Sequence, residues 1–206
     1  MPGVEGRGAD REASEEEPMS QRITHSECIY APGDGELVKE LFIALGFAVR
    51  KGERSPYIIA HVDPDVMDVM SNVIYASELT EMQQAFEKTL QATLASSQEF
   101  REATDNWEKD FRDDPQRSVH FGFEYASHES FQATIDRLRE ASGPGKPLEG
   151  RLLVTGVYFP GDEGSITDTM AQGFVWTDVM ASGILTFGQH LELQWHIEPS
   201  VVPTRA

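Results

Sequence analysis

The stretch HSECIYA at residues 25–31 returns as HFGFEYA at residues 120–126, with His, Tyr and Ala at matching positions. Both stretches are typical of β-strands, and both lead into a segment with helical spacing that ends near a glycine. The two strands agree with each other and with the order of elements on either side of them. A duplication is therefore the economical explanation, and we take the two strands as the starts of two repeats.

Each repeat is predicted to run strand, helix, strand, strand, strand. The helix of the first repeat can be capped by Asp34 and ended by Gly46. Its later strands are FAVRKGE (47–53), YIIAHVD (57–63) and NVIYASE (72–78). The second repeat continues with a helix over 127–143 and with strands GRLLVTGVYF (150–159), GFVWTDVMA (173–181) and QHLELQWHIE (189–198).

The expected fold class is α+β, with two tandem βαβββ modules that form a cupped mixed β-sheet with flanking helices. A helical linker joins the modules, because Met82, Phe86, Leu90 and Leu94 recur at every fourth position. The predicted divisions are a disordered acidic N-terminus (1–20), the first module (21–79), the linker (80–115), the second module (116–200) and a C-terminal tail (201–206).

Composition limits the partners of the chain. Its 206 residues contain 35 acidic and 17 basic side chains, and the net charge of −18 repels nucleic-acid phosphates and anionic lipid. The sequence contains no apolar run long enough to span a bilayer. The only cysteine, Cys28, cannot form an intramolecular disulfide, which favours a reducing, cytoplasmic setting. We expect neither a nucleic acid nor a membrane as partner.

Polar side chains share one face of the strands that begin and end the second repeat. Side chains alternate across a strand, so one face of the last strand is polar and the other apolar. His190, Glu192, Gln194 and His196 form the polar face, opposite Leu191, Leu193, Trp195 and Ile197. Imidazole and carboxylate ligands bind divalent transition metals. A metal site on this face is thus the leading hypothesis, against a solvated strand face and histidines that only hydrogen-bond locally.

These residues resemble the vicinal oxygen chelate superfamily, which includes glyoxalase I, extradiol dioxygenases and bleomycin-resistance proteins. The resemblance covers about residues 21–200. It implies metal ligands on the first and last strands of each module, which match His25 in RITHSECIY, His120 in RSVHFGFEY and Glu192 in HLELQW. Aligning NVIY with QHLE puts Tyr75 where the family usually has a fourth ligand, Glu.

The resemblance implies a metal-dependent enzyme that acts on a small organic substrate with chelating oxygen atoms. A site of two His and one Glu leaves coordination positions open, which favours Fe²⁺ and a dioxygenase, with Mn²⁺, Ni²⁺ and Zn²⁺ as alternatives. His190 is the candidate for proton transfer, and Tyr75 for a hydrogen bond to bound substrate. The alternatives are a glyoxalase-type isomerase, epimerase or lyase and a metal-free binding protein. The sequence leaves open whether modules pair within one chain or across a homodimer.

Overall fold

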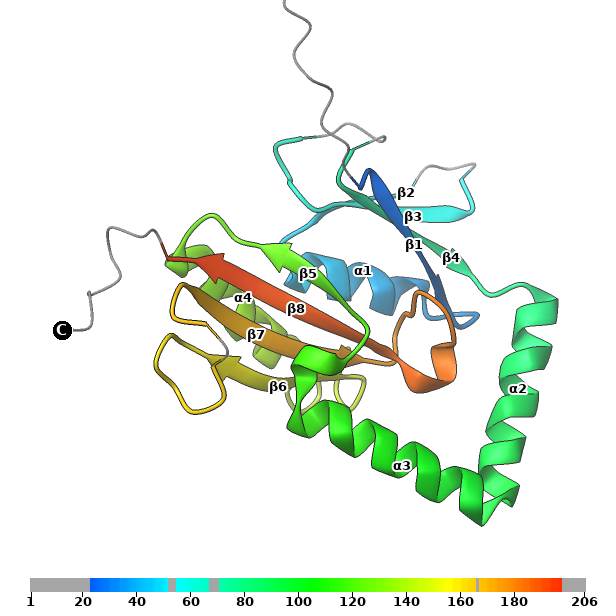
Figure 1. Ribbon diagram of the computed structural model, residues 1–206. Helices are drawn as coiled ribbons and strands as arrows, with labels where there is room; N and C mark the ends of the chain where they lie inside the picture. The colour runs from blue at the N-terminus through cyan, green and yellow to red at the C-terminus, as the bar shows by residue number, and fades with distance from the viewer. Residues whose placement is uncertain (1–22, 52–54, 67–70, 166, 198–206) are drawn as a thin grey trace, which may run out of the picture.

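The computed structural model describes residues 23–51, 55–66, 71–165 and 167–197 (Figure 1). Within these residues the fold is α+β, with two four-stranded mixed sheets and four α-helices. The predicted disordered segment 1–20 and the predicted tail 201–206 lie outside the described residues. No helix in the described part of the chain is long and apolar enough to cross a membrane.

The first sheet has the strand order β1-β4-β3-β2. Strand β1 pairs with β4 in parallel, whereas β4 with β3 and β3 with β2 are antiparallel. Helix α1 joins β1 to β2. The elements are β1 (His25–Tyr30), α1 (Gly35–Ala44), β2 (Ala48–Lys51), β3 (Tyr57–His61) and β4 (Val73–Glu78).

The second sheet has the corresponding order β5-β8-β7-β6, again with only the first pair parallel. The order strand, helix, three strands thus occurs in both halves of the chain, as the sequence predicts. The elements are the 3-10 helix η1 (Pro115–Arg117), β5 (His120–Glu124), α4 (His128–Ala141), β6 (Leu152–Tyr158), β7 (Met170–Thr177), the 3-10 helix η2 (Leu185–Phe187) and β8 (Gln189–His196).

The two parallel pairs share one register. In the first sheet Glu27 lies opposite Tyr75, two positions along from His25. In the second sheet Gly122 lies opposite Glu192, again two positions along from His120. Tyr75 is therefore the positional counterpart of Glu192, as the alignment of the two sequence stretches predicts.

The predicted linker is helical, but it consists of two helices, α2 (Glu81–Ser96) and α3 (Gln98–Asp113). Ser97 adopts an extended conformation, and its hydroxyl accepts the backbone N–H of Phe100, so that one residue ends α2 and caps α3. The two helices form a V beside the sheets (Figure 1). Near the start of the V, the buried Glu87 carboxylate accepts the backbone N–H groups of Leu185 and Thr186, which attaches α2 to η2.

A single hydrophobic core joins the two halves, and helices α1 and α4 pack together within it. The Tyr125 hydroxyl donates to the carbonyl oxygen of Leu45 across this contact, at 2.9 Å. The sequence predicts that the Asp34 side chain caps α1, but it makes no capping hydrogen bond. Its carboxylate instead binds Arg151 of the second half at 2.9 Å. Arg151 also binds Asp178 at 2.5 Å. This ion pair between halves replaces the expected local cap.

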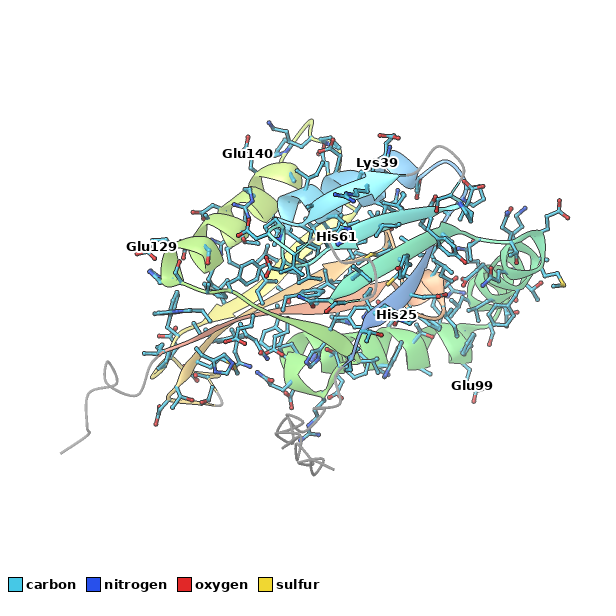
Figure 2. All side chains as sticks on the ribbon, turned by 90° about the horizontal axis from the view of Figure 1, so that it is seen from above. His25, Lys39, His61, Glu99, Glu129 and Glu140 are labelled. Carbon is cyan, nitrogen blue, oxygen red and sulfur yellow. The ribbon has the colours of Figure 1, made fainter. Side chains whose placement is uncertain are left out.

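Titratable side chains lie both in the interior and on the surface, and His61 is unusual among them because both of its buried ring nitrogens lack a hydrogen-bond partner within the described part of the chain. His61 is fully buried, and Cys28 faces the core, where burial raises the pKa of its thiol to about 12. Glu99, Glu129 and Glu140 project outward into solvent (Figure 2). These acidic side chains belong to the solvated surface.

Candidate functional site

The predicted apolar and polar side chains of β8 lie on opposite faces of the second sheet. Leu191 and Leu193 are fully buried in the core. Glu192 points to the other face and is also buried, with 3% of its surface exposed. A buried carboxylate requires partners, since an unpaired charge away from water costs several kcal/mol. The environment of Glu192 thus distinguishes it from an ordinary solvated charge.

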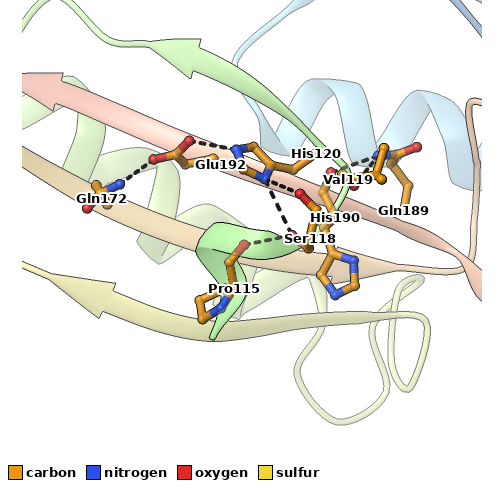
Figure 3. Close-up of polar contacts among 8 residues, drawn as sticks. All are labelled: Pro115, Ser118, Val119, His120, Gln172, Gln189, His190 and Glu192. Atoms are coloured by element: carbon orange, nitrogen blue, oxygen red, sulfur yellow. Dashed lines mark hydrogen bonds and ion pairs between the residues drawn. The ribbon is translucent and has the colours of Figure 1, made fainter. Parts of the chain in front are cut away.

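The partners of Glu192 come from the neighbouring strands. Its Oε2 atom lies 3.0 Å from Nε2 of His120 on β5, and its Oε1 atom accepts the side-chain amide of Gln172 on β7 at 2.6 Å (Figure 3). The other ring nitrogen of His120, Nδ1, lies 2.9 Å from the carbonyl oxygen of Ser118. Because a carbonyl only accepts, Nδ1 carries a proton, and Nε2 is directed at the carboxylate.

The electrostatics of the pair favour an imidazolium and a carboxylate. The hydrogen bond to Glu192 raises the pKa of His120, opposed by burial and helped by the carboxylate charge and the Ser118 carbonyl. Burial acts to raise the pKa of Glu192, but hydrogen bonds from His120, Gln172 and Gln194 outweigh it and hold that pKa below its ordinary value. The proton therefore stays on His120.

His190 lies beside this pair, since it is the cross-strand neighbour of His120 on β8. Burial lowers the pKa of His190, and the nearby charge of His120 lowers it further. The ring of Phe111 on α3 packs edge-on against it, with centroids 5.9 Å apart. A neutral imidazole next to a protonated one can accept a proton, which is the role that the sequence analysis assigns to His190.

His25 and Tyr75 lie together in the first sheet as His120 and Glu192 do in the second. The His25 ring is edge-on to the Tyr75 ring, with centroids 5.8 Å apart, and its Nδ1 atom is 3.1 Å from the Thr24 hydroxyl. The described ranges of the chain contain no group of three or more His, Cys, Asp or Glu side chains placed to hold a metal. The structure thus joins His120 to Glu192 but does not bring His25 to them, and the three-ligand set stays a prediction.

A cavity of about 1050 Å³ lies between the two halves and is lined by both predicted histidine ligands. His25 comes from β1 and His120 from β5, with further lining from Arg137 and Thr134 of α4. The contribution of α4 to this cavity and the contacts of Gln172 and Ser118 were not predicted from the sequence. A sequence signal for Gln172 exists, because it is a polar residue within the mostly apolar β7 and therefore needs a buried polar partner. No comparable pattern in the sequence marks Ser118.

Replacing Glu192 with Gln is expected to lower the pKa of His120, because the neutral amide removes both the ionic hydrogen bond and the charge. In the wild type the raised pKa of His120 stabilises the folded protein, fully so below about pH 6.5, and this contribution is lost as the pH rises through the folded-state pKa of His120. The contribution of Glu192, whose pKa is lowered, is lost in turn as the pH falls through its own folded-state pKa. Titration of the histidine ring resonances by NMR in metal-free protein measures the change. Glu124→Gln, an exposed residue on the same strand as His120, is the control. An unchanged His120 pKa in Glu192→Gln would contradict the assigned pair.

Comparisons with known proteins identify no family. No family model matches the chain, and no curated protein matches it. A solved structure of a hypothetical protein from S. aureus aligns with 86% of this chain and 94% of its own, at a TM-score of 0.41 and 11% sequence identity.

Proposed function

We propose that this chain is a metal-dependent enzyme of the vicinal oxygen chelate type, built from two duplicated βαβββ modules. Its substrate would be a small organic molecule that offers two neighbouring oxygen atoms, and an Fe²⁺ dioxygenase is the favoured form. The observation that carries the proposal is the His120–Glu192 pair, which joins strands β5 and β8 of the second sheet. The shared register of the two sheets supports the duplication.

The geometry of the pair is suited to a metal ion. Two ligand atoms that bind one ion at about 2.1 Å and at right angles lie about 3 Å apart, and Nε2 of His120 is 3.0 Å from Oε2 of Glu192. The bond from Nδ1 to Ser118 is the second contact that commonly orients a metal-binding imidazole. An ion would replace the proton between the two atoms. His25 lies on the same cavity and is the proposed third ligand.

The chain's own side chains would orient the substrate and move protons. A bound ion supplies Lewis acidity toward vicinal oxygen atoms and, as Fe²⁺, one-electron chemistry with dioxygen. Gln172 holds the Glu192 carboxylate in one orientation through its Oε1 atom. The neutral imidazole of His190 would take a proton from the substrate, and the Tyr75 hydroxyl would donate a hydrogen bond to the substrate.

A second candidate is a metal-free protein that binds a small molecule in the same cavity. Two observations favour it. Tyr75 stands where the family usually has a ligand, and the described residues lack a three-ligand group. In this case the cavity of about 1050 Å³ is the binding site itself, and its size suits a drug-sized ligand.

Metal content distinguishes the two candidates. Wild-type protein, stripped and then loaded anaerobically with Fe²⁺, Mn²⁺, Ni²⁺ or Zn²⁺, is expected to retain about one ion per chain by elemental analysis. His120→Ala, Glu192→Gln and His25→Ala should each lose it. His196→Ala, an exposed histidine at the end of β8, should retain it. Oxygen uptake by the Fe²⁺ form with catechol, a simple chelating diol, tests the dioxygenase.

Each outcome bears on a different part of the proposal. Folded wild-type protein that retains none of the four metals would contradict the metal-dependent enzyme and favour the metal-free binding protein. Metal retained by His25→Ala alone among the three variants would contradict the three-ligand set. A loaded Fe²⁺ form that takes up no oxygen with catechol or with other vicinal diols would turn the choice toward an isomerase or lyase.

A further inference from the structure

Helix α2 packs against the rest of the chain on one side only. Its contacts are chiefly with α3 and η2, and its less exposed positions recur with helical spacing along that side, at Gln84, Glu87, Leu90 and Leu94. Figure 1 shows α2 at the edge of the molecule, away from both sheets. The residues of the opposite side are all exposed, and we call them the outer face of α2: Met82, Ala85, Phe86, Thr89, Ala92, Thr93 and Ser96.

The outer face carries no charged side chain, which is unusual in this chain. The net charge is −18, and α3 alone contains six acidic and three basic residues. The exposed charges of α2 are Glu81 and Lys88, which have opposite signs and lie on one flank of the outer face. Met82 and Phe86 are 84% and 55% exposed. A face that lacks charge and exposes large apolar side chains is typical of an interface.

The hydroxyl groups of the outer face already have hydrogen-bond partners. The Thr89 hydroxyl donates to the carbonyl oxygen of Ala85 at 2.9 Å, and the Thr93 hydroxyl to that of Thr89 at 2.8 Å. The Ser96 hydroxyl donates to the carbonyl oxygen of Thr93 at 3.2 Å. Covering a donor that has no partner would oppose association. Because the helix supplies these partners itself, the outer face can be covered without leaving a donor unpaired.

The outer face is complementary in shape to a second copy of itself. Its large side chains, Met82 and Phe86, lie in the first two turns of the helix, and the small side chains of Ala92 and Ser96 lie in the last two. Antiparallel pairing about Thr89 puts the large side chains of each helix against the small ones of the other. Parallel pairing would put large side chains against large ones. A contact between two identical surfaces must be self-complementary in this way.

Charge favours the same partner. Two copies of a chain with a net charge of −18 repel each other over most of their surface. At the outer face they can meet without bringing carboxylates together, and the opposite signs of Glu81 and Lys88 leave its flank neutral. A strongly basic partner would instead be expected at an acidic surface such as that of α3.

We propose that the outer faces of α2 from two copies of this chain pack together antiparallel, about a two-fold axis near Thr89. The V formed by α2 and α3 is then the element that makes the dimer, and the His120–Glu192 pair takes no part in it. Two helices of this length bury less surface than the roughly 1,600 Å² of a standard interface. The dimer is therefore expected to be reversible, with a dissociation constant on the order of 10⁻⁵ M.

Sedimentation velocity of the full chain measures the association, at protein concentrations from about 1 to 300 µM and about 0.15 M salt, which screens the repulsion between copies. The wild type is expected to change from monomer to dimer over this range. The measurement is made without metal, because the dimer does not depend on the proposed function.

Phe86→Glu puts a carboxylate of each copy into the interface and should weaken the dimer at least about tenfold. Gln83→Glu is the matched control. It adds the same charge to the same helix outside the outer face, and a glutamate keeps the oxygen that accepts the Thr80 N–H. This variant should dimerise as the wild type does. Circular dichroism shows that each variant is folded.

Thr89→Cys tests the arrangement, because a residue at a two-fold axis meets its own copy. Under mild oxidation Thr89→Cys should form a disulfide-linked dimer, whereas Gln91→Cys, outside the outer face, should not. The buried Cys28 is the same in both variants. The proposal is overturned if the wild type stays monomeric at about 300 µM, if folded Phe86→Glu dimerises as strongly as the wild type, or if Gln91→Cys crosslinks and Thr89→Cys does not. The first outcome needs no variant, so it holds even if Phe86→Glu fails to fold.

Discussion

Gly188→Ala is expected to lower the free energy of unfolding by at least about 3 kcal/mol. Gly188 ends η2 and directs the chain into β8, with φ 70° and ψ −163°, a backbone conformation that is essentially restricted to glycine. A Cβ at this position would collide with the backbone carbonyl of Thr177 and would lie 2.8 Å from Nε1 of Trp176. The Thr177 carbonyl belongs to the sheet and cannot move away without disturbing β7.

Gly183→Ala is the matched control, because it lies in the same loop and an added Cβ would meet nothing within 4 Å. Chemical denaturation followed by circular dichroism compares both variants with the wild type. Gly183→Ala should change the midpoint little. Equal midpoints for the two variants would show that the conformation of Gly188 does not constrain the entry into β8, and therefore does not fix the position of His190 and Glu192.

Leu41→Ala is expected to destabilise the whole chain by about 2–5 kcal/mol. Leu41 is fully buried in helix α1 and belongs to the core that joins both halves. Truncation leaves a cavity that the packed surroundings only partly fill. Because the halves share this core, the loss of stability should lower the unfolding midpoint of the second half as well as that of the first.

Tryptophan fluorescence provides the measurement, because the three tryptophans, Trp107, Trp176 and Trp195, all lie outside the first half. Leu41→Ala should shift their unfolding midpoint as far as it shifts the midpoint seen by circular dichroism. Ile43→Ala is the control, on the same helix but 54% exposed. An unchanged tryptophan transition in Leu41→Ala, with an altered circular dichroism transition, would mean that the halves unfold independently.

The features that the sequence predicts well are those that repeat or alternate along it. The matching stretches at 25–31 and 120–126 predict an α+β fold, which the structure has, and each of them coincides with a strand that is followed by a helix and three further strands. The alignment of NVIY with QHLE predicts that Tyr75 is the counterpart of Glu192, and the strand registers confirm it. Both inferences depend on local periodicity, which each segment carries within itself.

Contacts between distant segments are beyond such reasoning. Asp34 stands at the position of a helix cap, but its carboxylate binds the Arg151 side chain, which lies 117 residues away in the sequence. The sequence predicts one helical linker from apolar residues at every fourth position between Met82 and Leu94, and this spacing does not record the break at Ser97 that follows it. For the same reason, the sequence pairs His25 with His120 through the repeat but cannot measure the distance between them.

The attachment of Glu87 to η2 limits where this chain can change length. Its carboxylate accepts three donors at the start of η2, including the Thr186 hydroxyl, so the base of the V formed by α2 and α3 is held against the loop that precedes β8. The tip of the V at Ser97 has no such attachment in the contacts of the described chain. Insertions and deletions in related chains should therefore accumulate at Ser97, where a longer or shorter hairpin leaves β8 in place.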